Sequence, residues 1–205
     1  MKILAVSDMV VDWIYSPTMR LLLSDTELAI GCGDLPFDYL EFILSSLDIP
    51  LFYVHGNHSR PEPEGKPVGY KSLGSVCIHC KVMRYRDYTI AGVDGSLKYN
   101  TGNYQYTQTE MWLNVIKLVP SLLLNRINYG RFLNVFVSHA PPWGIHDGTD
   151  LPHQGIKAFR WLDAQFQPDY HLHGHIHVYR PDMITVSEFG KTRVINTYGY
   201  QQIKL

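Results

Sequence analysis

The first third of the chain alternates short apolar runs with segments of helical periodicity. Residues 2–7 (KILAVS), 28–34 (LAIGCGD) and 50–58 (PLFYVHGNH) each join a strand-length apolar run to small or polar residues. Between these runs, residues 17–28 and 37–47 space their apolar positions three and four apart, which predicts helices. This βαβαβ order, with runs of consecutive apolar residues, is typical of strands buried in a sheet.

The rest of the chain continues the mixed pattern. Two further helices are predicted, over 107–127 and 155–166; the first has Thr107 or Thr109 as a possible cap and Pro120 as a kink. Strands or strand pairs are predicted over 75–96, 132–142, 170–177, 183–189 and 192–198, the last two forming a hairpin about Gly190. Residues 60–69, with three prolines and two glycines, are predicted to form a surface loop within one domain that covers 1–205.

Composition narrows the class of protein. The 205 residues are 45% hydrophobic and 18% charged, as expected for one globular domain with a sizeable core. The formal net charge is -1 and no dense basic patch occurs, so we expect neither a nucleic-acid polymer nor a membrane surface as partner. The opening MKILAVSD is too short for a secretory segment and no apolar run has membrane-spanning length, which predicts a cytoplasmic protein.

The cysteines do not suggest a disulfide framework. Cys32, Cys77 and Cys80 are few and odd in number, which argues against structural disulfides. CIHC at 77–80 has the spacing of half a zinc site or of a redox pair, but no second pair occurs. The flanking residues predict a strand that would point the two sulfurs to opposite faces, so we expect ordinary strand cysteines.

A histidine on every second position marks the stretch YHLHGHIHVY, residues 170–179. Alternate side chains of a strand share a face, so the four imidazoles could line the wet side of an edge strand. Alternatively some of them converge on a metal ion, because neutral imidazole is the commonest metal ligand.

The ends of the other predicted strands favour the metal. In open α/β sheets, functional groups gather beyond the carboxyl ends of the strands. The residues that follow the predicted strands are all metal ligands or proton-transfer groups: Asp8, Asp34, Asn57 and His58, His139, and His175 and His177. Oxygen and imidazole ligands suit divalent Mn, Fe, Zn or Ni, whereas the thiolates of a structural zinc site are missing from this set.

In order and spacing, these residues resemble the calcineurin-like metallophosphoesterases. The family motifs D-x-H, G-D-x-x-[DG], G-N-H-[DE], a later strand-end histidine and G-H-x-H correspond here to five segments: DMV (8–10), GDLPFD (33–38), GNHS (56–59), SHAPP (138–142) and GHIH (174–177). The resemblance implies a four-layer α/β/β/α sandwich with a metal site at the strand ends.

The resemblance also implies roles. Asp34 would bridge two divalent metals; Asp8 and His177 would complete the first, and Asn57, His139 and His175 the second. Metal-activated water would attack the phosphorus of a small phosphomonoester or phosphodiester, and His58 would protonate the leaving group as general acid. His171 and His173, earlier on the strand, are expected to be structural or to support a ligand through hydrogen bonds.

The chain departs from the family pattern at two positions. Val10 stands where the histidine of D-x-H is expected, and Ser59 where an acid often orients the preceding histidine. The first metal position is therefore weakened: it could be filled by water or another side chain, left empty in a one-metal enzyme, or belong to an inactive scaffold. Nearby side chains that could fill the gap are Asp12, His146, Asp147, Asp150 and His153.

We favour an active phosphatase or phosphodiesterase, because only one ligand position is lost; the alternative is a weak or inactive binding scaffold. The segment 92–110 resembles a substrate loop of one bacterial and archaeal branch, in which Tyr99, Tyr104 and Tyr106 could stack on a base or sugar and Lys98 could meet a phosphate. Trp143 could contact substrate at the rim or pack. The sequence leaves the substrate, the metal and the oligomeric state open.

Overall fold

The computed structural model describes residues 1–59 and 74–205, so the predicted loop at 60–69 lies outside the described residues. A five-stranded sheet has the order β13-β1-β2-β3-β4. Its strands are β1 (Lys2–Ser7), β2 (Leu28–Gly31), β3 (Leu51–Tyr53), β4 (Ser75–Cys77) and β13 (Gly199–Lys204). The first four run parallel, and β13 pairs antiparallel with β1 at the edge.

A six-stranded sheet has the order β11-β12-β10-β9-β6-β5. Its strands are β5 (Lys81–Tyr85), β6 (Tyr88–Val93), β9 (Val135–Ser138), β10 (Tyr170–His173), β11 (Val186–Phe189) and β12 (Thr192–Asn196). The four central strands are parallel, and an antiparallel hairpin closes each edge. Two short strands, β7 (Ser96–Leu97) and β8 (Gln105–Tyr106), form a separate pair.

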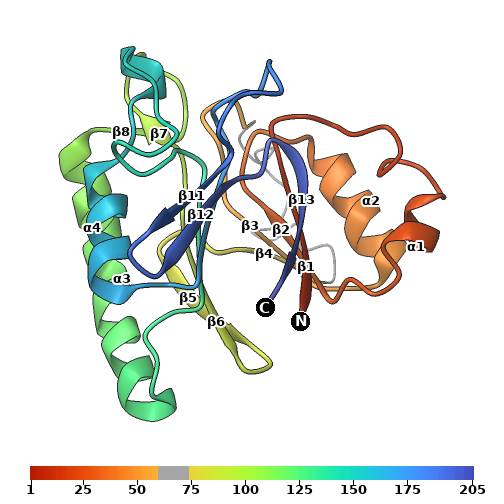
Figure 1. The fold of residues 1–205 in the computed structure, drawn as a ribbon, viewed down its shortest axis with the longest axis horizontal. Coiled ribbons are helices and arrows are strands. Elements are labelled where there is room, and N and C mark those ends of the chain that lie inside the picture. The colour runs from red at the N-terminus through yellow and green to blue at the C-terminus, as the bar shows by residue number, and fades with distance from the viewer. Residues whose placement is uncertain (60–73) are drawn as a thin grey trace, which may run out of the picture.

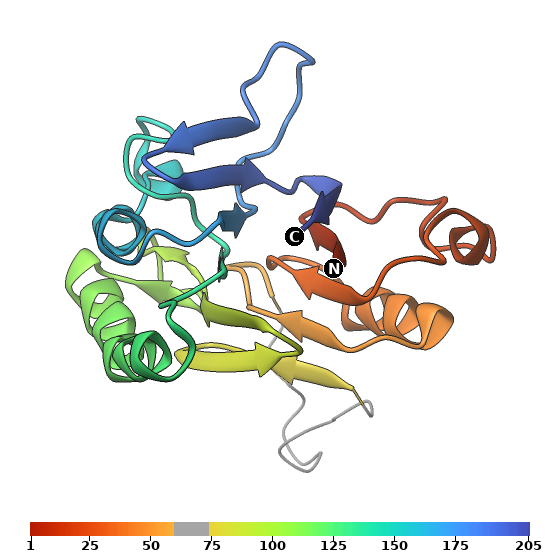
Figure 2. The same cartoon turned by 60° about the horizontal axis from the view of Figure 1, so that its bottom comes forward.

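Helices cover the outer faces of both sheets (Figures 1 and 2). The helices are α1 (Met19–Leu22), α2 (Phe37–Leu47), α3 (Gln108–Tyr129) and α4 (Lys157–Phe166), with a 3-10 turn, η1, at Leu151–His153. Helices α1 and α2 lie against the five-stranded sheet, and α3 and α4 against the six-stranded one. The order of layers is therefore α/β/β/α, which confirms the predicted sandwich.

Strand periodicity divides the core into three layers. In β1, Ile3 and Ala5 face the space between the sheets, whereas Leu4 and Val6 pack under α1 and α2. In the same way, β9 directs Val135 and Val137 between the sheets and Phe136 toward α3 and α4. Burial on both faces explains why these strands are apolar at consecutive positions.

Several predicted elements are shorter than expected. Residues 17–28 form only the four-residue α1, because the chain must turn to enter β2; the Glu27 N–H already bonds the Lys2 carbonyl. The strands predicted over 28–34 and 170–177 end at Gly31 and His173, and the strand-to-loop segments predicted over 50–58 and 132–142 pass from strand to loop after Tyr53 and Ser138. In each case the trailing polar residues leave the sheet and form the loop beyond its carboxyl end.

Two predictions about strand continuity are wrong. The strand expected over 192–198 ends at Asn196, and at Gly199, whose φ is 73°, the chain enters the other sheet as β13. The strand expected around CIHC ends at Cys77, and Cys80 adopts a left-handed φ of 52°. Residues 78–80 thus carry the chain from the five-stranded to the six-stranded sheet.

Helix α3 begins with a capping box. The Thr107 hydroxyl accepts the Glu110 N–H, and the Glu110 carboxylate accepts the Thr107 N–H. Thr109 lies inside the helix, and Pro120 is accommodated within it. No helix among the described residues is long and apolar enough to cross a membrane.

The capping box leads to a stability prediction. Thr107→Ala removes the acceptor of an otherwise unpaired N–H and should lower the free energy of unfolding by about 1 kcal/mol. Thr109→Ala, an equal truncation in the same exposed turn, should change it by less than about 0.5 kcal/mol. Urea denaturation of both variants measures the difference, and equal losses would contradict the assignment of the cap.

Candidate metal centre

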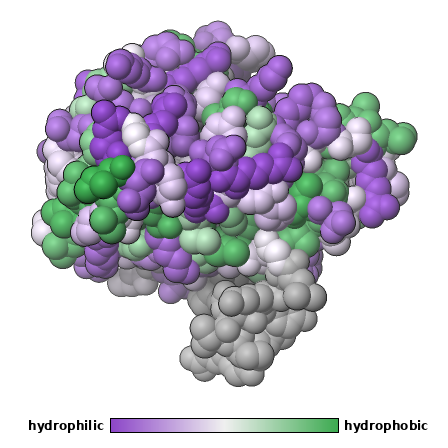
Figure 3. All heavy atoms as spheres, turned by 90° about the horizontal axis from the view of Figure 1, so that it is seen from below, coloured by the Kyte–Doolittle hydropathy of each residue, from purple (hydrophilic) through white to green (hydrophobic). Residues whose placement is uncertain are grey.

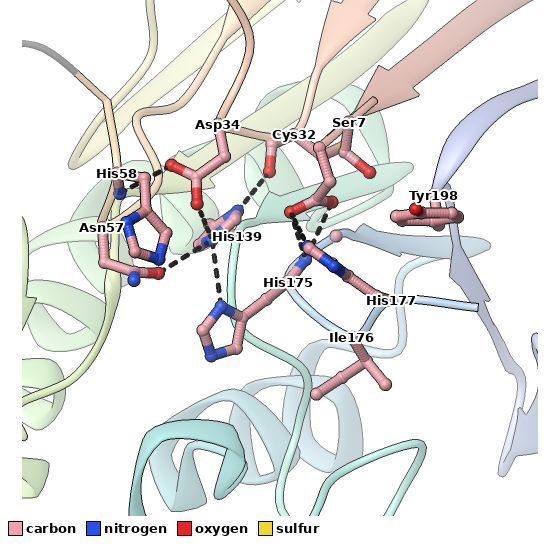
Figure 4. A network of polar contacts seen from close by, with 12 residues as sticks. Ser7, Cys32, Asp34, Asn57, His58, His139, His175, Ile176, His177 and Tyr198 are labelled. Carbon is pink, nitrogen blue, oxygen red and sulfur yellow. Dashed lines mark hydrogen bonds and ion pairs between the residues drawn. The ribbon is translucent and has the colours of Figure 1, made fainter. Parts of the chain in front are cut away.

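The loops that follow the parallel strands of both sheets bring the predicted site residues together (Figure 4). The five-stranded sheet supplies Asp8 after β1, Asp34 after β2, and Asn57 with His58 after β3. The six-stranded sheet supplies the other three, His139 after β9 and His175 and His177 after β10. The centre therefore lies across the junction of the two sheets.

Three of these residues have a backbone conformation that non-glycine residues rarely adopt. Asp8, Asp34 and His175 have φ values of 61°, 55° and 68°. A left-handed conformation costs of order 1–3 kcal/mol per residue and is found mainly at functional sites. Here it turns each side chain out of its strand direction and toward the centre.

Two motif glycines allow the backbone to approach the carboxylates. A Cβ atom on Gly56 would lie 2.2 Å from Asp34 Oδ1, and one on Gly174 would lie 2.4 Å from Asp8 Oδ2. Both contacts are far below van der Waals distance, so any side chain there would displace a carboxylate. The glycines of G-N-H and G-H-x-H are thus required by the packing of the site.

The Nε2 atom of His139 lies at the middle of the group. It is 3.1 Å from Asp34 Oδ2, 3.1 Å from Asn57 Oδ1 and 3.1 Å from His175 Nδ1. His139 is fully buried, and Asn57 and His175 are each 6% exposed. A ligand atom from each of Asp8, Asp34 and His139 lies within 4.8 Å of the other two.

The hydrogen-bond donors of this group point away from the middle. His139 Nδ1 donates to the Cys32 carbonyl at 2.8 Å, and His175 Nε2 donates to the Pro152 carbonyl at 2.8 Å. The Asn57 amide donates to the Tyr99 hydroxyl at 3.0 Å, which turns its oxygen inward. These outer partners fix the tautomers and rotamers of the ligands, as partners of metal ligands usually do.

This arrangement fits a divalent cation. With the donors used outside, the inner atoms of Asp34, Asn57, His139 and His175 all present lone pairs to one another. These lone pairs repel one another unless a positive charge lies among them. Oxygen and imidazole ligands suit a borderline divalent metal ion. Without a metal, a proton on His139 would have to supply that charge.

In the metal-free protein, burial and neighbouring charges together set the pKa values of the residues in the centre. Burial by itself lowers the pKa of His139, but Asp34, Asp8 and the Cys32 carbonyl outweigh it and raise that pKa to about 9. Burial by itself raises the pKa of Asp34, but His139 and the His58 N–H outweigh it and lower that pKa to about 2. Burial and the neighbouring His139 hold the pKa of His175 at about 3, so His175 offers a neutral imidazole.

Asp8 and His177 lie on the other side of the centre. The Asp8 carboxylate accepts the His175 N–H at 3.0 Å through Oδ2, and its Oδ1 lies 3.8 Å from His177 Nε2. Burial raises the pKa of Asp8. Tyr198, which was not among the predicted site residues, lies beside His177 with a ring-centroid distance of 5.0 Å (Figure 4).

The residues suggested for the Val10 gap are engaged elsewhere or exposed. His146 bonds His173 and Ser187, and Asp147 accepts the Gly155 N–H. Asp150 and His153 pair with each other at 2.6 Å, and Asp12 is exposed. Val10 itself is partly buried against the apolar cluster under α2.

Ser59 and His58 both lie against the Asp34 carboxylate. The Ser59 hydroxyl accepts the Gly56 N–H at 2.9 Å and lies 3.5 Å from Asp34 Oδ1. The His58 N–H donates to the same oxygen at 2.8 Å, while its imidazole is exposed at the rim. Ser59 thus supports Asp34, and the His58 side chain is open to a ligand.

His171 and His173 are completely buried beneath the centre. His171 Nδ1 lies 2.7 Å from Asp163 Oδ2 and its Nε2 lies 2.8 Å from the Ser138 hydroxyl, which donates to the Ala140 carbonyl. His173 donates to the Gly174 carbonyl and accepts from His146. Only His175 and His177 of the four alternating histidines therefore face the centre.

Most of the aromatic side chains suggested as substrate contacts interact with other residues of the protein. Tyr99 orients Asn57, and Tyr104 stacks on His55 with centroids 4.3 Å apart. Tyr106 lies parallel to His79 at 6.0 Å. Trp143 is partly exposed beneath the Lys157 ammonium, which is 4.8 Å from its ring, and Lys98 is exposed. The supporting carbonyls of Cys32 and Pro152 carry no signal in side-chain identity, so the sequence could not reveal them.

The sequence model of the calcineurin-like phosphoesterases matches residues 1–179. The chain belongs to this family. No curated protein matches the chain as a relative.

Solved structures show the same fold at low identity. TT1561 of Thermus thermophilus is 16% identical, with a TM-score of 0.62 over 97% of this chain and 89% of that one. GAP50, the anchor in the inner membrane complex of Plasmodium, is 12% identical, with a TM-score of 0.57 over 96% of this chain and 70% of that one. The calcineurin-like fold therefore occurs both here and in a protein described as an anchor.

The geometry leads to a metal-binding prediction. His139→Ala and His175→Ala each remove one inward lone pair and should weaken Mn²⁺ binding by at least about 10–100-fold, the range seen for loss of outer supporting groups. His58→Ala, at the rim of the same loops, should keep wild-type metal content. Elemental analysis after equilibration and gel filtration measures all three. Wild-type metal content in both ligand variants would mean that the assigned ligands are wrong.

Proposed function

We propose that this protein is a metal-dependent phosphoric ester hydrolase. Its metals would be held by Asp8, Asp34, Asn57, His139, His175 and His177, with Asp34 shared between two positions. The observation that carries the proposal is the convergence of three lone-pair atoms, each 3.1 Å from His139 Nε2, with donors directed outward. When bound, divalent cations lower the pKa of water and offset charge on phosphoryl oxygens.

The protein's own residues supply positioning and a proton. The His58 N–H donates to Asp34, and its imidazole is exposed, which supports a role for it beside the proposed metal ligands. A positioned imidazole can protonate a departing alkoxide, which typically contributes 10²–10⁴-fold to the rate. His58 is therefore proposed as the general acid.

The exposed groups around the centre suit a small substrate. His177 is exposed beside Asp8, and we propose that it, with the exposed Lys98 and the Trp143–Lys157 pair, contacts a phosphate ester. Tyr104 and Tyr106 are stacked on histidines, so a role for them in base stacking is not favoured. We propose a small phosphomonoester or phosphodiester as substrate; cytoplasmic location stays a prediction from the sequence.

A screen for hydrolysis tests the proposal directly. Protein supplied with Mn²⁺ should hydrolyse p-nitrophenyl phosphate, bis-p-nitrophenyl phosphate or both, and the relative rates would separate monoester from diester activity. His139→Ala should abolish the activity, which excludes a contaminating enzyme. Absence of turnover with Mn²⁺, Fe²⁺, Zn²⁺ and Ni²⁺, with metal bound, would overturn the proposal.

A scaffold role is the second candidate. Helix α3 exposes apolar side chains on its outer surface: Leu113, Ile116, Leu123, Leu124, Ile127 and Tyr129. Figure 3, which views the molecule from below, shows hydrophobic residues gathered on the flank where α3 lies. An inert protein that binds a partner through this helix, and loses it in Ile116→Glu, would support this role.

The general acid leads to a kinetic prediction. His58→Asn should lower kcat by roughly 10²–10⁴-fold on an alkyl phosphate ester, whose leaving group needs a proton. The loss should be much smaller on the p-nitrophenyl ester, because p-nitrophenolate leaves as an anion. Steady-state kinetics on both substrates measures the contrast, and metal content should stay unchanged. Equal losses on the two esters would exclude the acid role.

The Val10 position leads to a second metal prediction. The position held by Asp8 and His177 should bind metal more weakly than the other, and Val10→His should tighten it by at least about tenfold. Val11→His, at the next residue, serves as the matched control and should bring no gain. Titration of stoichiometry and affinity measures both variants.

Two tight metals in the wild type, with no gain in Val10→His, would mean that another group already fills the gap. Tyr198 is then the first candidate, because it lies beside His177 at the open side of Asp8. In that case Tyr198→Phe should weaken metal binding at the position held by Asp8 and His177, whereas Tyr200→Phe, two residues along and also partly exposed, should not.

A further inference from the structure

A second group of metal-ligating side chains lies outside the candidate centre. We propose that His55, Cys77 and Asp94 bind one zinc-like divalent cation that ties the two sheets together. The proposal does not depend on the chain being a phosphoesterase, and it assigns a role to the CIHC segment that the candidate centre does not use.

The three ligand atoms are close together. Asp94 Oδ2 is 2.7 Å from His55 Nδ1, and Cys77 Sγ is 3.7 Å from the same nitrogen. All three atoms lie within 4.8 Å of one another. Zinc bonds of about 2.0–2.3 Å place tetrahedral ligands about 3.2–3.8 Å apart. The sulfur–nitrogen distance already fits, and a cation would have to widen the nitrogen–oxygen contact by about half an ångström.

Neighbouring groups hold the ligands in place. Asp94 Oδ1 accepts the His55 N–H at 3.0 Å, and the Asp94 N–H donates to His79 Nδ1 at 2.9 Å. Tyr104 stacks on the His55 ring with an interplanar angle of 2°. The carboxylate and the imidazole are thus fixed before a metal arrives, which lowers the entropic cost of binding.

The donor set selects a different cation from that of the candidate centre. A thiolate with an imidazole and a carboxylate favours zinc, whereas the oxygen-rich centre also suits manganese. Cys77 is a free, half-buried cysteine, so its sulfur can lose a proton to a metal. His55 and Cys77 are partly exposed, which leaves a path for the ion and a position for water.

The location explains what the cation would do. His55 follows β3, Cys77 ends β4, and Asp94 follows β6, so the first two come from the five-stranded sheet and the third from the six-stranded one. Residues 78–80, directly after Cys77, are the crossing between the sheets. A metal bound here would cross-link both sheets at that crossing.

Cobalt spectroscopy tests the site separately from the candidate centre. Metal-free His139→Ala/His175→Ala protein should bind one Co²⁺ and show the near-ultraviolet charge-transfer band of a cobalt–thiolate bond. Cys77→Ser on that background should remove the band, and Cys80→Ser, three residues along, should retain it. A band that survives Cys77→Ser, a band that Cys80→Ser removes, or no band at all would overturn the assignment.

The wild-type protein provides a measurement that needs no ligand variant. Zn²⁺ should slow alkylation of Cys77 by about tenfold or more, because a metal-bound thiolate is no longer a free nucleophile. Cys80 should react at an unchanged rate, as followed by peptide mass mapping. Equal rates for Cys77 with and without Zn²⁺ would also overturn the proposal, whatever the hydrolytic activity proves to be.

Discussion

The candidate centre depends on one electrostatic constraint, the close approach of lone pairs around His139 Nε2. Three acceptor atoms at 3.1 Å from that nitrogen are tolerable only around a positive charge. Three features bring these atoms together: the left-handed backbone at Asp34 and His175, the glycine at position 56, and the hydrogen bonds that the ligands' outer atoms donate. Their conformational cost is offset only when a cation or a proton is present.

The mixed α/β class was predictable because it depends on local patterns, whereas the four-layer order followed from the resemblance of the motifs to the family. Consecutive apolar residues in the strands reflect burial on two faces, and the helix expected over 37–47 is observed over the same residues, Phe37–Leu47. The motif residues were identifiable because parallel strands place their following loops at one edge. The ligand roles assigned to these residues remain predictions, although the fold brings them together.

Other features depend on tertiary contacts that the sequence does not display. The crossing after Cys77 requires a left-handed Cys80, and β13 exists because it can pair with β1 of the other sheet. Periodicity alone cannot show that a strand changes sheets. Likewise, the sequence left open whether Tyr104 and Tyr106 contact substrate or pack within their loop, because the histidines they stack on are distant in sequence.

The core between the sheets has a consequence for the chemistry at its edge. Ile30, Val137 and Leu172 are completely buried there and set the separation of the two layers that carry the candidate ligands. Close-packed interiors transmit strain, so trimming one of these side chains would let the layers shift by fractions of an ångström. The affinity of the candidate centre for a metal would then depend on the distance between the sheets. A cavity far from the candidate ligands would change which ion binds best.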